Sequence, residues 1–307
     1  MEQLNQLKNL LGEELKENIL LSDYSTMKVG GLAKYFFVAK SINDLIRSIT
    51  ISKELNIKYR IIGGGSNVIF SSQIFDGLII LNKCSNIIVI KEKHQIIVDS
   101  GLSLARLIME SANHELSGIE PLAGIPGTVG GAIYGNAGAF GIEISQFVVS
   151  VTLLNKSGKI VRCKMQDLKP SYRTTYLKDQ RKSNKEVPAI LSIKLQLRPG
   201  KKEEIINKIS YYKKVRSDKQ PYDKPNCGSV FKNPGNSTEH SAGYILDKLS
   251  AKKIKIGDAQ VSNKHANFVI NNGNATVDDV IGVINQMKDV VREKTGMVLE
   301  EEIEYIC

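Results

Sequence analysis

Cysteine and histidine are scarce in this chain, which has four of each among 307 residues. The cysteines (Cys84, Cys163, Cys227 and Cys307) lie far apart and form no Cys-x-x-Cys pair. A chain of this length builds its core without disulfides, so we expect all four to be reduced thiols. The histidines are equally scattered, and because no spacing typical of metal ligands occurs we expect no metal site.

Long apolar runs are lacking as well. No run approaches the roughly 20 residues that a membrane-spanning helix needs. The first residues carry Glu2, Glu13 and Glu14 and lack the apolar segment of a secretory signal. We therefore expect no membrane insertion and a cytoplasmic location.

Acidic residues are fewer than basic ones, since 32 Asp and Glu against 42 Lys and Arg give a net charge of +10. Such an excess favours anionic partners. The lysines are spread along the whole chain, however, and basic pairs such as Lys201–Lys202 lack the interleaved aromatic side chains of a nucleic-acid surface. We expect phosphorylated small molecules as partners, no nucleic acid and no obligate protein partner.

The hydrophobic pattern is that of a globular α+β protein, with 42% hydrophobic and 24% charged residues. The length predicts two or three domains. Leucines at positions 4, 7, 11 and 15 predict an amphipathic first helix, and alternation over 191–197 predicts a half-buried strand. Further elements are predicted as strands at 59–62, 78–81, 87–90, 96–98 and 148–154, and as a helix from Leu102 to about Asn113.

A break in the pattern at residues 198–201 marks the predicted start of the last domain. The lysine- and tyrosine-rich segment after it predicts a helix to about Arg216. Thr276 and Asp279 have the spacing of a capping box for a helix with an apolar stripe. That helix is predicted to end at Gly296 and to be followed by a strand-like tail.

Three consecutive glycines follow the predicted strand at 59–62, in the sequence GGGSN at residues 63–67. A dinucleotide fingerprint GxGxxG would need glycine at position 68, which is valine, and no GxxxxGK[ST] motif occurs. Neither a Rossmann fold nor a P-loop is therefore predicted. Glycines let the backbone approach a ligand and direct N–H groups at it. On the residues alone, a ligand loop and a tight turn are equally favoured.

A second glycine-rich segment spans residues 124–141, GIPGTVGGAIYGNAGAFG, with seven glycines in eighteen residues. Ordinary turns do not need that density, and the glycines leave the main chain uncovered. Thr128, Asn136 and the backbone amides are donors for a phosphate or a ring heteroatom. Two such loops in one half of the chain favour a large nucleotide cofactor with a pyrophosphate in its middle.

These loops and several further motifs resemble one enzyme family. YRIIGGGSNVIF and GIEPLAGIPGTVGGAIYGNAGAFG are similar to the FAD-binding region of the UDP-N-acetylenolpyruvoylglucosamine reductase family, whose FAD-binding fold is of the vanillyl-alcohol-oxidase/p-cresol methylhydroxylase type. The motifs STMKVGG, SYRTT, CGSVFKNP, QVSNKHANFVIN and LEEEIEYI follow in the family's order. The chain resembles the shorter class of the family, because the segment between Arg173 and Pro225 has no room for the extra loop that covers the substrate in other members.

The resemblance implies an α+β flavoprotein in three parts. Two FAD-binding subdomains would span 1–82 and 83–198, an α+β substrate-binding domain would span 199–296, and the tail 297–307 would complete the first subdomain. FAD would be the bound cofactor and NADPH the co-substrate. The residues that the resemblance and the loops place at FAD are Gly63, Gly64, Gly65, Ser66, Asn67, Gly124, Ile125, Pro126, Gly127, Thr128, Gly130, Gly131, Asn136, Ala137 and Gly138.

The implied reaction has two halves. NADPH first reduces the flavin. Hydride then passes from the flavin N5 to C3 of the enolpyruvyl group of UDP-N-acetylglucosamine enolpyruvate, which gives UDP-N-acetylmuramate for peptidoglycan synthesis. The resemblance assigns three catalytic residues to this reaction, Arg173, Ser229 and Glu302.

Each catalytic residue also has a physical interpretation. Arg173 offers a planar fork suited to the substrate carboxylate. Ser229 would deliver a proton to C2 at short range, and Glu302 would stabilise the enolate-like intermediate. Without the resemblance, a turn or capping role would be favoured for Ser229. Strand periodicity does not select Glu302 from its acidic neighbours; only the LEEEIEYI match does, and there Glu301 stands where the family usually has proline and Glu304 where it usually has arginine.

The same resemblance assigns the UDP-sugar to Lys232 and Asn233, with Tyr172 and Arg216 as weaker candidates. His265 fits a structural hydrogen bond as well as a ligand contact. Two other functions stay open on the sequence. An FAD-dependent oxidase of the same superfamily would pass electrons to oxygen, and a flavin-binding module without catalysis would keep the loops but not the reaction.

Overall fold

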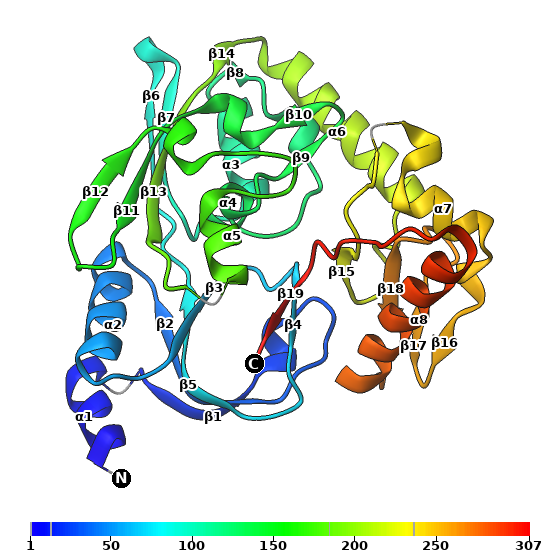
Figure 1. Ribbon diagram of the computed structural model, residues 1–307. Coiled ribbons are helices and arrows are strands. Elements are labelled where there is room, and N and C mark those ends of the chain that lie inside the picture. Colours follow the sequence, from blue (N-terminus) through cyan, green and yellow to red (C-terminus); the bar gives the residue numbers. More distant parts are fainter. Residues whose placement is uncertain (1, 13, 184, 236) are drawn as a thin grey trace. The chain divides into compact units, whose positions relative to one another are not determined.

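The computed structural model describes residues 2–12, 14–183, 185–235 and 237–307. The chain forms two compact units, each assembled from three stretches of chain (Figure 1). The first unit comprises Met1–Glu17, Tyr35–Gly64 and Gly77–Val215, and the second comprises Asn18–Lys34, Gly65–Asp76 and Arg216–Cys307. The division passes through the first glycine loop, so that loop contributes residues to both units.

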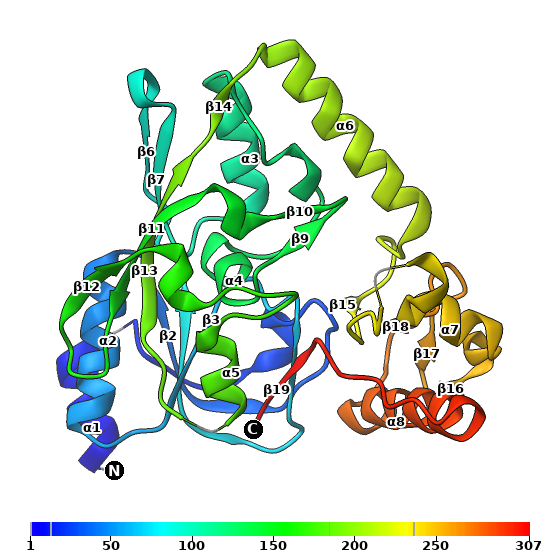
Figure 2. The ribbon, with the colours of Figure 1, turned by 45° about the horizontal axis from the view of Figure 1, so that its top comes forward.

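The larger sheet of the first unit is antiparallel and has the strand order β12-β11-β13-β7-β6 (Figure 2). Its strands are β6 (Ile87–Ile90), β7 (Gln95–Asp99), β11 (Val148–Leu154), β12 (Ile160–Cys163) and β13 (Ala189–Gln196). Alternate residues of β13 are buried from Ala189 to Leu195, which confirms the predicted half-buried strand. Ile193 and Leu195 share a hydrophobic core with the helices α3 (Leu104–Asn113) and α4 (Val129–Tyr134).

A smaller sheet carries the first glycine loop. Its strand order is β1-β2-β5-β3, and β3 runs parallel to β5. The strands and the two helices that share a core with them are β1 (Lys16–Leu20), β2 (Leu32–Ala39), β3 (Tyr59–Ile62), β5 (Phe75–Asn82), α1 (Glu2–Leu11) and α2 (Ile42–Glu54). The first helix is shorter than its leucine spacing predicts, because Gly12 has a φ of +79°. Leu15 is buried but lies beyond the helix, and the side chain of Leu4 lies outside the described part of the chain.

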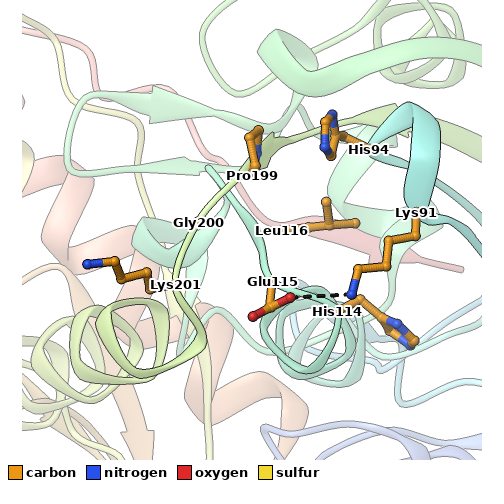
Figure 3. Close-up of a pocket in the computed structure, with 8 residues that line it drawn as sticks. All are labelled: Lys91, His94, His114, Glu115, Leu116, Pro199, Gly200 and Lys201. Atoms are coloured by element: carbon orange, nitrogen blue, oxygen red, sulfur yellow. Dashed lines mark hydrogen bonds and ion pairs between the residues drawn. The ribbon is translucent and has the colours of Figure 1, made fainter.

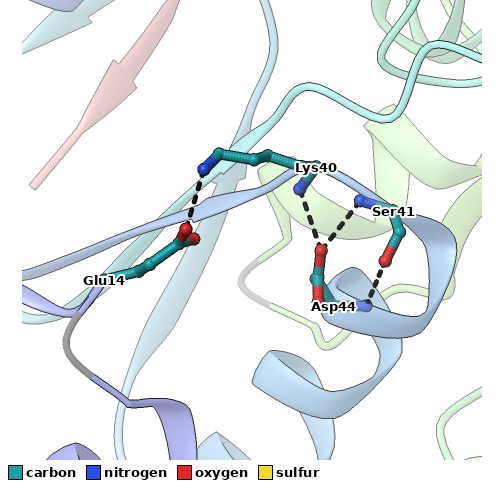
Figure 4. Close-up of polar contacts among 4 residues, drawn as sticks. All are labelled: Glu14, Lys40, Ser41 and Asp44. Atoms are coloured by element: carbon teal, nitrogen blue, oxygen red, sulfur yellow. Dashed lines mark hydrogen bonds and ion pairs between the residues drawn. The ribbon is translucent and has the colours of Figure 1, made fainter.

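Polar contacts fix the start of α2 (Figure 4). The Ser41 hydroxyl accepts a hydrogen bond from the Asp44 N–H at 3.1 Å, and the Asp44 carboxylate accepts one from the Ser41 N–H at 2.9 Å, which together form a capping box. The Lys40 ammonium lies 2.7 Å from the Glu14 carboxylate, and this hydrogen bond raises the pKa of Lys40. The contacts tie the segment after α1 to the start of α2.

The second unit has its own antiparallel sheet, with the strand order β15-β18-β17-β16. Its elements are β15 (Asn226–Ser229), β16 (Lys255–Ile256), β17 (Ala259–Val261), β18 (Phe268–Asn271), α7 (Ala242–Lys248) and α8 (Val277–Thr295), which share one hydrophobic core. The predicted capping box of Thr276 and Asp279 is confirmed at the start of α8. The predicted end of that helix is confirmed too, since Gly296 follows it with a φ of +72°.

The tail after α8 is extended in two separate places. Glu301 forms an isolated bridge with Phe231, and β19 (Glu304–Ile306) pairs in parallel with β4 (Val68–Phe70). A bend at Ile303 separates the two pairings, so the predicted strand is not continuous. The tail nevertheless returns to the strand that directly follows the first glycine loop.

The remaining elements are β8 (Leu116–Ser117), β9 (Gly138–Ala139), β10 (Ile142–Glu143), β14 (Arg198–Pro199), α5 (Tyr176–Lys182) and α6 (Lys202–Lys219). The helix α6 confirms the one predicted after the break at 198–201. The strands predicted at 59–62, 78–81, 87–90, 96–98 and 148–154 fall within observed strands, and the one predicted over 191–197 ends one residue earlier, at Gln196. The three-part division at residues 82 and 198 stays a prediction. Among the described helices, none is both long and apolar enough to cross a membrane.

Candidate functional site

The two glycine-rich loops meet backbone to backbone in the first unit. A methyl group placed on Gly64 would lie 2.8 Å from the Cα of Gly127, and one placed on Gly63 would overlap the Thr128 side chain. Such distances are too short for any real side chain. Gly63 and Gly64 are therefore required for the packing of one loop against the other, a reason for glycine that the sequence alone does not show.

The second loop rests on the segment between β7 and α3. The Gly130 N–H donates to the Ser100 carbonyl at 2.7 Å, and the Leu104 N–H donates to the Gly127 carbonyl at 3.0 Å. A methyl on Gly130 would lie 2.8 Å from the Ser100 Cβ, so this contact also requires glycine. Sequence reasoning missed this supporting segment, whose one local signal is the glycine at position 101 directly after a predicted strand.

The outer part of the second loop stays accessible. Gly124, Ile125, Gly127 and Thr128 are half-buried, whereas Pro126 and Gly131 are exposed. A methyl on Gly131 would meet only the Thr128 hydroxyl oxygen, at 3.5 Å, so open space adjoins the backbone there. The loop thus combines a tightly packed inner side with an uncovered outer side, as a backbone cradle for a ligand requires.

In the second unit, the first loop continues as Gly65, Ser66 and Asn67. Gly65 has a φ of +63° and accepts a hydrogen bond from the Thr26 N–H at 3.1 Å. The Asn67 side-chain amide donates to the Glu302 carbonyl at 3.1 Å, and the Asn67 carbonyl accepts from the N–H two residues further along that tail, at 3.0 Å. Asn67 therefore holds the segment that carries Glu302 against the end of the glycine loop.

Ser229 is the last residue of β15, and the backbone of that strand is fixed on both sides. Ser229 pairs with Phe268 of β18. At the other end, the Thr26 hydroxyl donates to the Asn226 carbonyl at 2.6 Å, and the Asn226 N–H donates to the Thr26 carbonyl at 3.1 Å. Between them Gly228 has a φ of +80°, a conformation that favours glycine. Thr26 belongs to the STMKVGG motif. It connects the glycine loop to β15 through these hydrogen bonds, a positioning role that the sequence did not reveal.

Glu302 lies beside Ser229 in the second unit. Its N–H donates to the carbonyl of Val230, the residue after Ser229, at 2.8 Å. The two preceding acids are engaged elsewhere, since the Glu300 carboxylate lies 2.8 Å from the Lys232 ammonium and the Glu301 carboxylate lies 2.8 Å from that of Lys288. The structure thus brings together two of the three predicted catalytic residues on adjacent backbone segments.

Asn267 is a buried residue of this region that sequence reasoning missed. Its side-chain oxygen accepts from the Phe231 N–H at 3.0 Å, and its side-chain nitrogen donates to the Phe231 carbonyl at 2.8 Å. Its own carbonyl accepts from the Val230 N–H at 2.9 Å. Asn267 therefore fixes the two residues that follow Ser229. The QVSNKHANFVIN motif contains it, but nothing local distinguishes it from the other asparagines there.

His265 is a half-buried neighbour of Asn267. Its Nδ1 accepts from the Asn267 N–H at 3.2 Å, and its ring packs edge-on against Phe268 with 4.9 Å between centroids. Burial lowers the pKa of His265, because the apolar surroundings disfavour the charged ring. Of the two roles left open by the sequence, these contacts favour the structural hydrogen bond.

The other predicted substrate residues of the second unit also have partners within the protein. The Lys232 side chain is 14% exposed and pairs with Glu300. The side-chain oxygen of Asn233 accepts from the first N–H of α7 at 3.1 Å. The Arg216 side chain is hydrogen-bonded to Tyr222, whose pKa burial raises and Arg216 partly lowers.

Arg173 lies in the first unit, beside the end of the second glycine loop. It sits at a tight turn closed by a bridge between Ser171 and Thr174, with a φ of +58°. Its guanidinium lies 5.0 Å from the ring centroid of the exposed Tyr172. A methyl on Gly138 would lie 3.0 Å from an Arg173 guanidinium nitrogen, so the small residue leaves room for the arginine.

Asn136 joins the second loop to the turn that carries Arg173. It is fully buried, and its amide nitrogen donates to the Ser171 carbonyl at 2.9 Å and to the Glu143 carboxylate at 2.8 Å. These two bonds use both amide hydrogens within the protein. Ala137, which follows, is held by a bond from its N–H to the Ala132 carbonyl at 2.8 Å.

A separate pocket of about 370 Å³ opens in the first unit, and none of the predicted site residues lines it (Figure 3). Its lining residues are Lys91, His94, His114, Glu115, Leu116, Pro199, Gly200 and Lys201. The Lys91 ammonium lies 3.3 Å from the Glu115 carboxylate, and both side chains are more than half exposed. The pocket lies beside the end of α3 and the strands β8 and β14, and its lining includes no residue of the glycine loops.

Comparison with known proteins decides the family. A family model described as the C-terminal domain of UDP-N-acetylenolpyruvoylglucosamine reductase matches residues 220–306, and one described as an FAD binding domain matches residues 33–164. The UDP-N-acetylenolpyruvoylglucosamine reductase of Lactobacillus acidophilus is 36% identical over 307 residues, which cover 100% of this chain and 99% of that protein. That of Halalkalibacterium halodurans is 36% identical over 308 residues, with coverage of 100% and 99%. The chain belongs to the UDP-N-acetylenolpyruvoylglucosamine reductase family.

A solved member of the reductase family has the same fold. The crystal structure of the Thermus caldophilus reductase superposes with a TM-score of 0.78 at 29% identity, covering 94% of this chain and 98% of that one. The predicted family and the predicted α+β flavoprotein fold are therefore confirmed. The roles of single residues stay predictions.

The residues of this chain fit the FAD that its FAD-binding domain implies. Both glycine loops lie within the matched residues 33–164. The open space beside Gly131 and the accessible backbone from Gly124 to Thr128 are what a bound nucleotide cofactor needs. The inner glycines hold the two loops together, so this accessible surface is rigidly supported.

Proposed function

We propose that the protein is a UDP-N-acetylenolpyruvoylglucosamine reductase, which uses NADPH to convert UDP-N-acetylglucosamine enolpyruvate to UDP-N-acetylmuramate for peptidoglycan synthesis. Full-length membership of the reductase family supports this proposal. The observation that carries it in the structure is the hydrogen bond from Glu302 to Val230, which holds Glu302 next to Ser229. The partners of this function are two small anionic molecules, NADPH and the UDP-sugar, and we place the reaction in the cytoplasm.

Bound FAD supplies the hydride carrier between NADPH and the UDP-sugar. The residues of this chain that would hold it are those of the outer loop surface, from Gly124 to Thr128 together with Gly131, and the loop that begins at Gly63. Asn67 and Asn136 support these loops through hydrogen bonds to Glu302 and to Ser171.

The substrate becomes more negative as hydride adds to C3, because charge builds up at C2 and on its carboxylate. The Arg173 guanidinium is a planar cation that offers two parallel N–H groups to that carboxylate. Each such charged hydrogen bond contributes about 1.5–3 kcal/mol. Glu302 would stabilise the same enolate-like charge in the form that carries its proton, since an ionised carboxylate would repel it.

Ser229 completes the reaction by giving its hydroxyl proton to C2. A free serine is a poor acid, so the transfer depends on short-range, fixed geometry. The backbone of β15 provides it, because the bonds from Thr26, Asn267 and Glu302 fix the strand before and after Ser229.

The test is an anaerobic stopped-flow experiment on the FAD-loaded protein. NADPH should bleach the flavin absorbance, and the enolpyruvyl UDP-sugar should then restore it. Ser229→Ala should leave bleaching nearly intact but slow the recovery by about 10²-fold or more, the usual contribution of a general acid. Ser237→Ala, which changes an exposed serine of the same unit, serves as the matched control.

Each alternative has its own signature in this experiment. Recovery at an unchanged rate in Ser229→Ala would refute the role of Ser229. Bleaching without recovery in the unmodified protein would refute the assignment of the enolpyruvyl UDP-sugar as the substrate. When the same mixtures are run with oxygen admitted, rapid oxygen consumption that does not depend on the UDP-sugar would favour an oxidase. A protein that takes up no FAD would refute the cofactor.

A further inference from the structure

The Glu301 carboxylate is held on the core side of the tail by two other elements. The Lys288 ammonium, on α8, donates to it at 2.8 Å, and the Glu301 side chain is only 19% exposed. The Tyr305 hydroxyl, on β19, lies close to the same carboxylate. A single acidic side chain thus joins the tail, a long helix and the C-terminal strand.

The pairing of Phe231 with Glu301 shows which way that side chain points. The Lys232 N–H donates to the Glu300 carbonyl and the Glu302 N–H donates to the Val230 carbonyl, both at 2.8 Å. Phe231 and Glu301 are therefore a pair without hydrogen bonds between them, whose side chains lie on the same face. Phe231 is 1% exposed, so this face is the core of the second unit.

Glu302 follows Glu301 on an extended backbone and so presents its carboxylate to the opposite face. The N–H and carbonyl of Glu301 take no part in the two bonds that join the tail to the segment after Ser229. Its side chain is what secures residue 301 to the rest of the unit. Any rotation of the tail that moved the Glu302 carboxylate would have to break the contacts of Glu301 with Lys288 and Tyr305.

The charge of Glu301 reaches the strand that carries Ser229. Burial, with a smaller contribution from the Glu301 carboxylate, raises the pKa of Cys227 to about 12. Burial also raises the pKa of Tyr305, again with an added contribution from Glu301. Half-buried ion pairs of this kind add little to stability, and their best-attested use is to select one arrangement of the chain.

We infer that Glu301 is a positioning residue: held by Lys288 and Tyr305, it fixes the orientation of the tail so that Glu302 and Ser229 stay aligned for the second half of the reaction. This inference rests on the roles proposed above for Glu302 and Ser229. Glu301 itself shares the core-facing side of Phe231 and is paired there with Lys288. Its removal should lower the rate of the reducing step on the substrate and leave substrate binding unchanged.

The experiment separates the two half-reactions in Glu301→Ala, Lys288→Met and the double variant. Flavin reduction by NADPH and the KM for the UDP-sugar should stay within about twofold of the unmodified protein. Flavin reoxidation by the UDP-sugar should slow by about tenfold or more in each single variant, since misplacing a reacting group by about 1 Å costs up to about 10²-fold. The double variant should be no slower than the worse single one, because both changes break the same contact.

Two further variants test the mechanism of positioning. Glu301→Gln keeps an oxygen that accepts from Lys288 and should recover most of the lost rate. Tyr305→Phe removes only a hydroxyl and should show a weaker form of the same defect even if Glu301→Ala does not fold. Hydrogen exchange over residues 298–306 should rise in Glu301→Ala and stay unchanged in Glu301→Gln. Glu293→Gln, an exposed acid on α8, is the matched control.

The result that overturns the inference is clear. It fails if both half-reactions slow equally, or if reoxidation keeps its normal rate in Glu301→Ala and Lys288→Met. Failure of the proposed function looks different, because the unmodified protein would then show no reoxidation by the UDP-sugar at all.

Discussion

Asn267 offers the sharpest test of how the site is held. In Asn267→Ala, the Phe231 N–H and carbonyl both lose their side-chain partners. Phe231 is 1% exposed, so water does not replace them. Each unsatisfied buried group costs about 1–3 kcal/mol, which predicts a loss of about 2–6 kcal/mol in the free energy of unfolding. That is a large part of the roughly 5–15 kcal/mol available to a folded protein.

The assay is urea unfolding of the FAD-loaded protein, followed by circular dichroism and by flavin fluorescence. Hydrogen exchange over residues 228–234 gives a local reading, and it should rise in Asn267→Ala before any global change. Asn263→Ala changes an exposed asparagine of the same segment and should cost less than about 0.5 kcal/mol. If Asn267→Ala is as stable as Asn263→Ala, the hydrogen bonds to Phe231 do not fix β15 and the reasoning is wrong.

Gly64→Ala sets a methyl 2.8 Å from the Gly127 Cα, and we expect a loss of about 1–3 kcal/mol with weaker FAD uptake. Gly131→Ala meets open space and should lower only FAD affinity; equal melting temperatures for the two variants without FAD would contradict this. Burial lowers the pKa of His265 from 6.5, so the unfolded chain takes up the proton first and stability falls as the pH drops below 6.5. His265→Asn keeps an acceptor and should flatten that fall in urea midpoints measured against pH. Burial raises the pKa of Asp99 from 3.8, so ionisation of this carboxyl lowers the stability of the protein as the pH rises through the pKa of the folded state. The urea midpoint of Asp99→Asn should equal that of the unmodified protein below pH 3.8 and exceed it at neutral pH. A lower midpoint at neutral pH would contradict this prediction.

Much of the fold was predictable wherever one face of an element is buried. The strand β13 shows this best, because its alternate residues are buried and its sequence alternates in step. The helix α8 was predictable from its capping box and terminal glycine, which act within a few residues of the chain. Leu15 shows the limit of periodicity, since its spacing continues the helix but Gly12 ends it.

The site was less predictable, because its decisive contacts join distant segments. Asn67 and Glu302 are 235 residues apart, and the local sequence around either residue does not indicate that the two are in contact. Asn267 binds both the N–H and the carbonyl of Phe231 through its side chain. Every asparagine has the same donor and acceptor, so the residue type alone does not show which one has this role. Gly63 and Gly64 were predicted to lie at the cofactor. The structure adds a second reason for glycine at both positions, since they pack against Gly127 and Thr128 of the other loop, and the local sequence does not show this contact.

The make-up of the second unit has a consequence for biosynthesis. Its first two pieces, Asn18–Lys34 and Gly65–Asp76, leave the ribosome long before the third, Arg216–Cys307. During that interval β4 has no β19 to pair with, and the Thr26 hydroxyl has no Asn226 carbonyl to bind. The first unit, by contrast, has all of its segments once Val215 has been made. Translation therefore separates the two units in time: the glycine cradle of the first is complete before the strand that carries Ser229 exists.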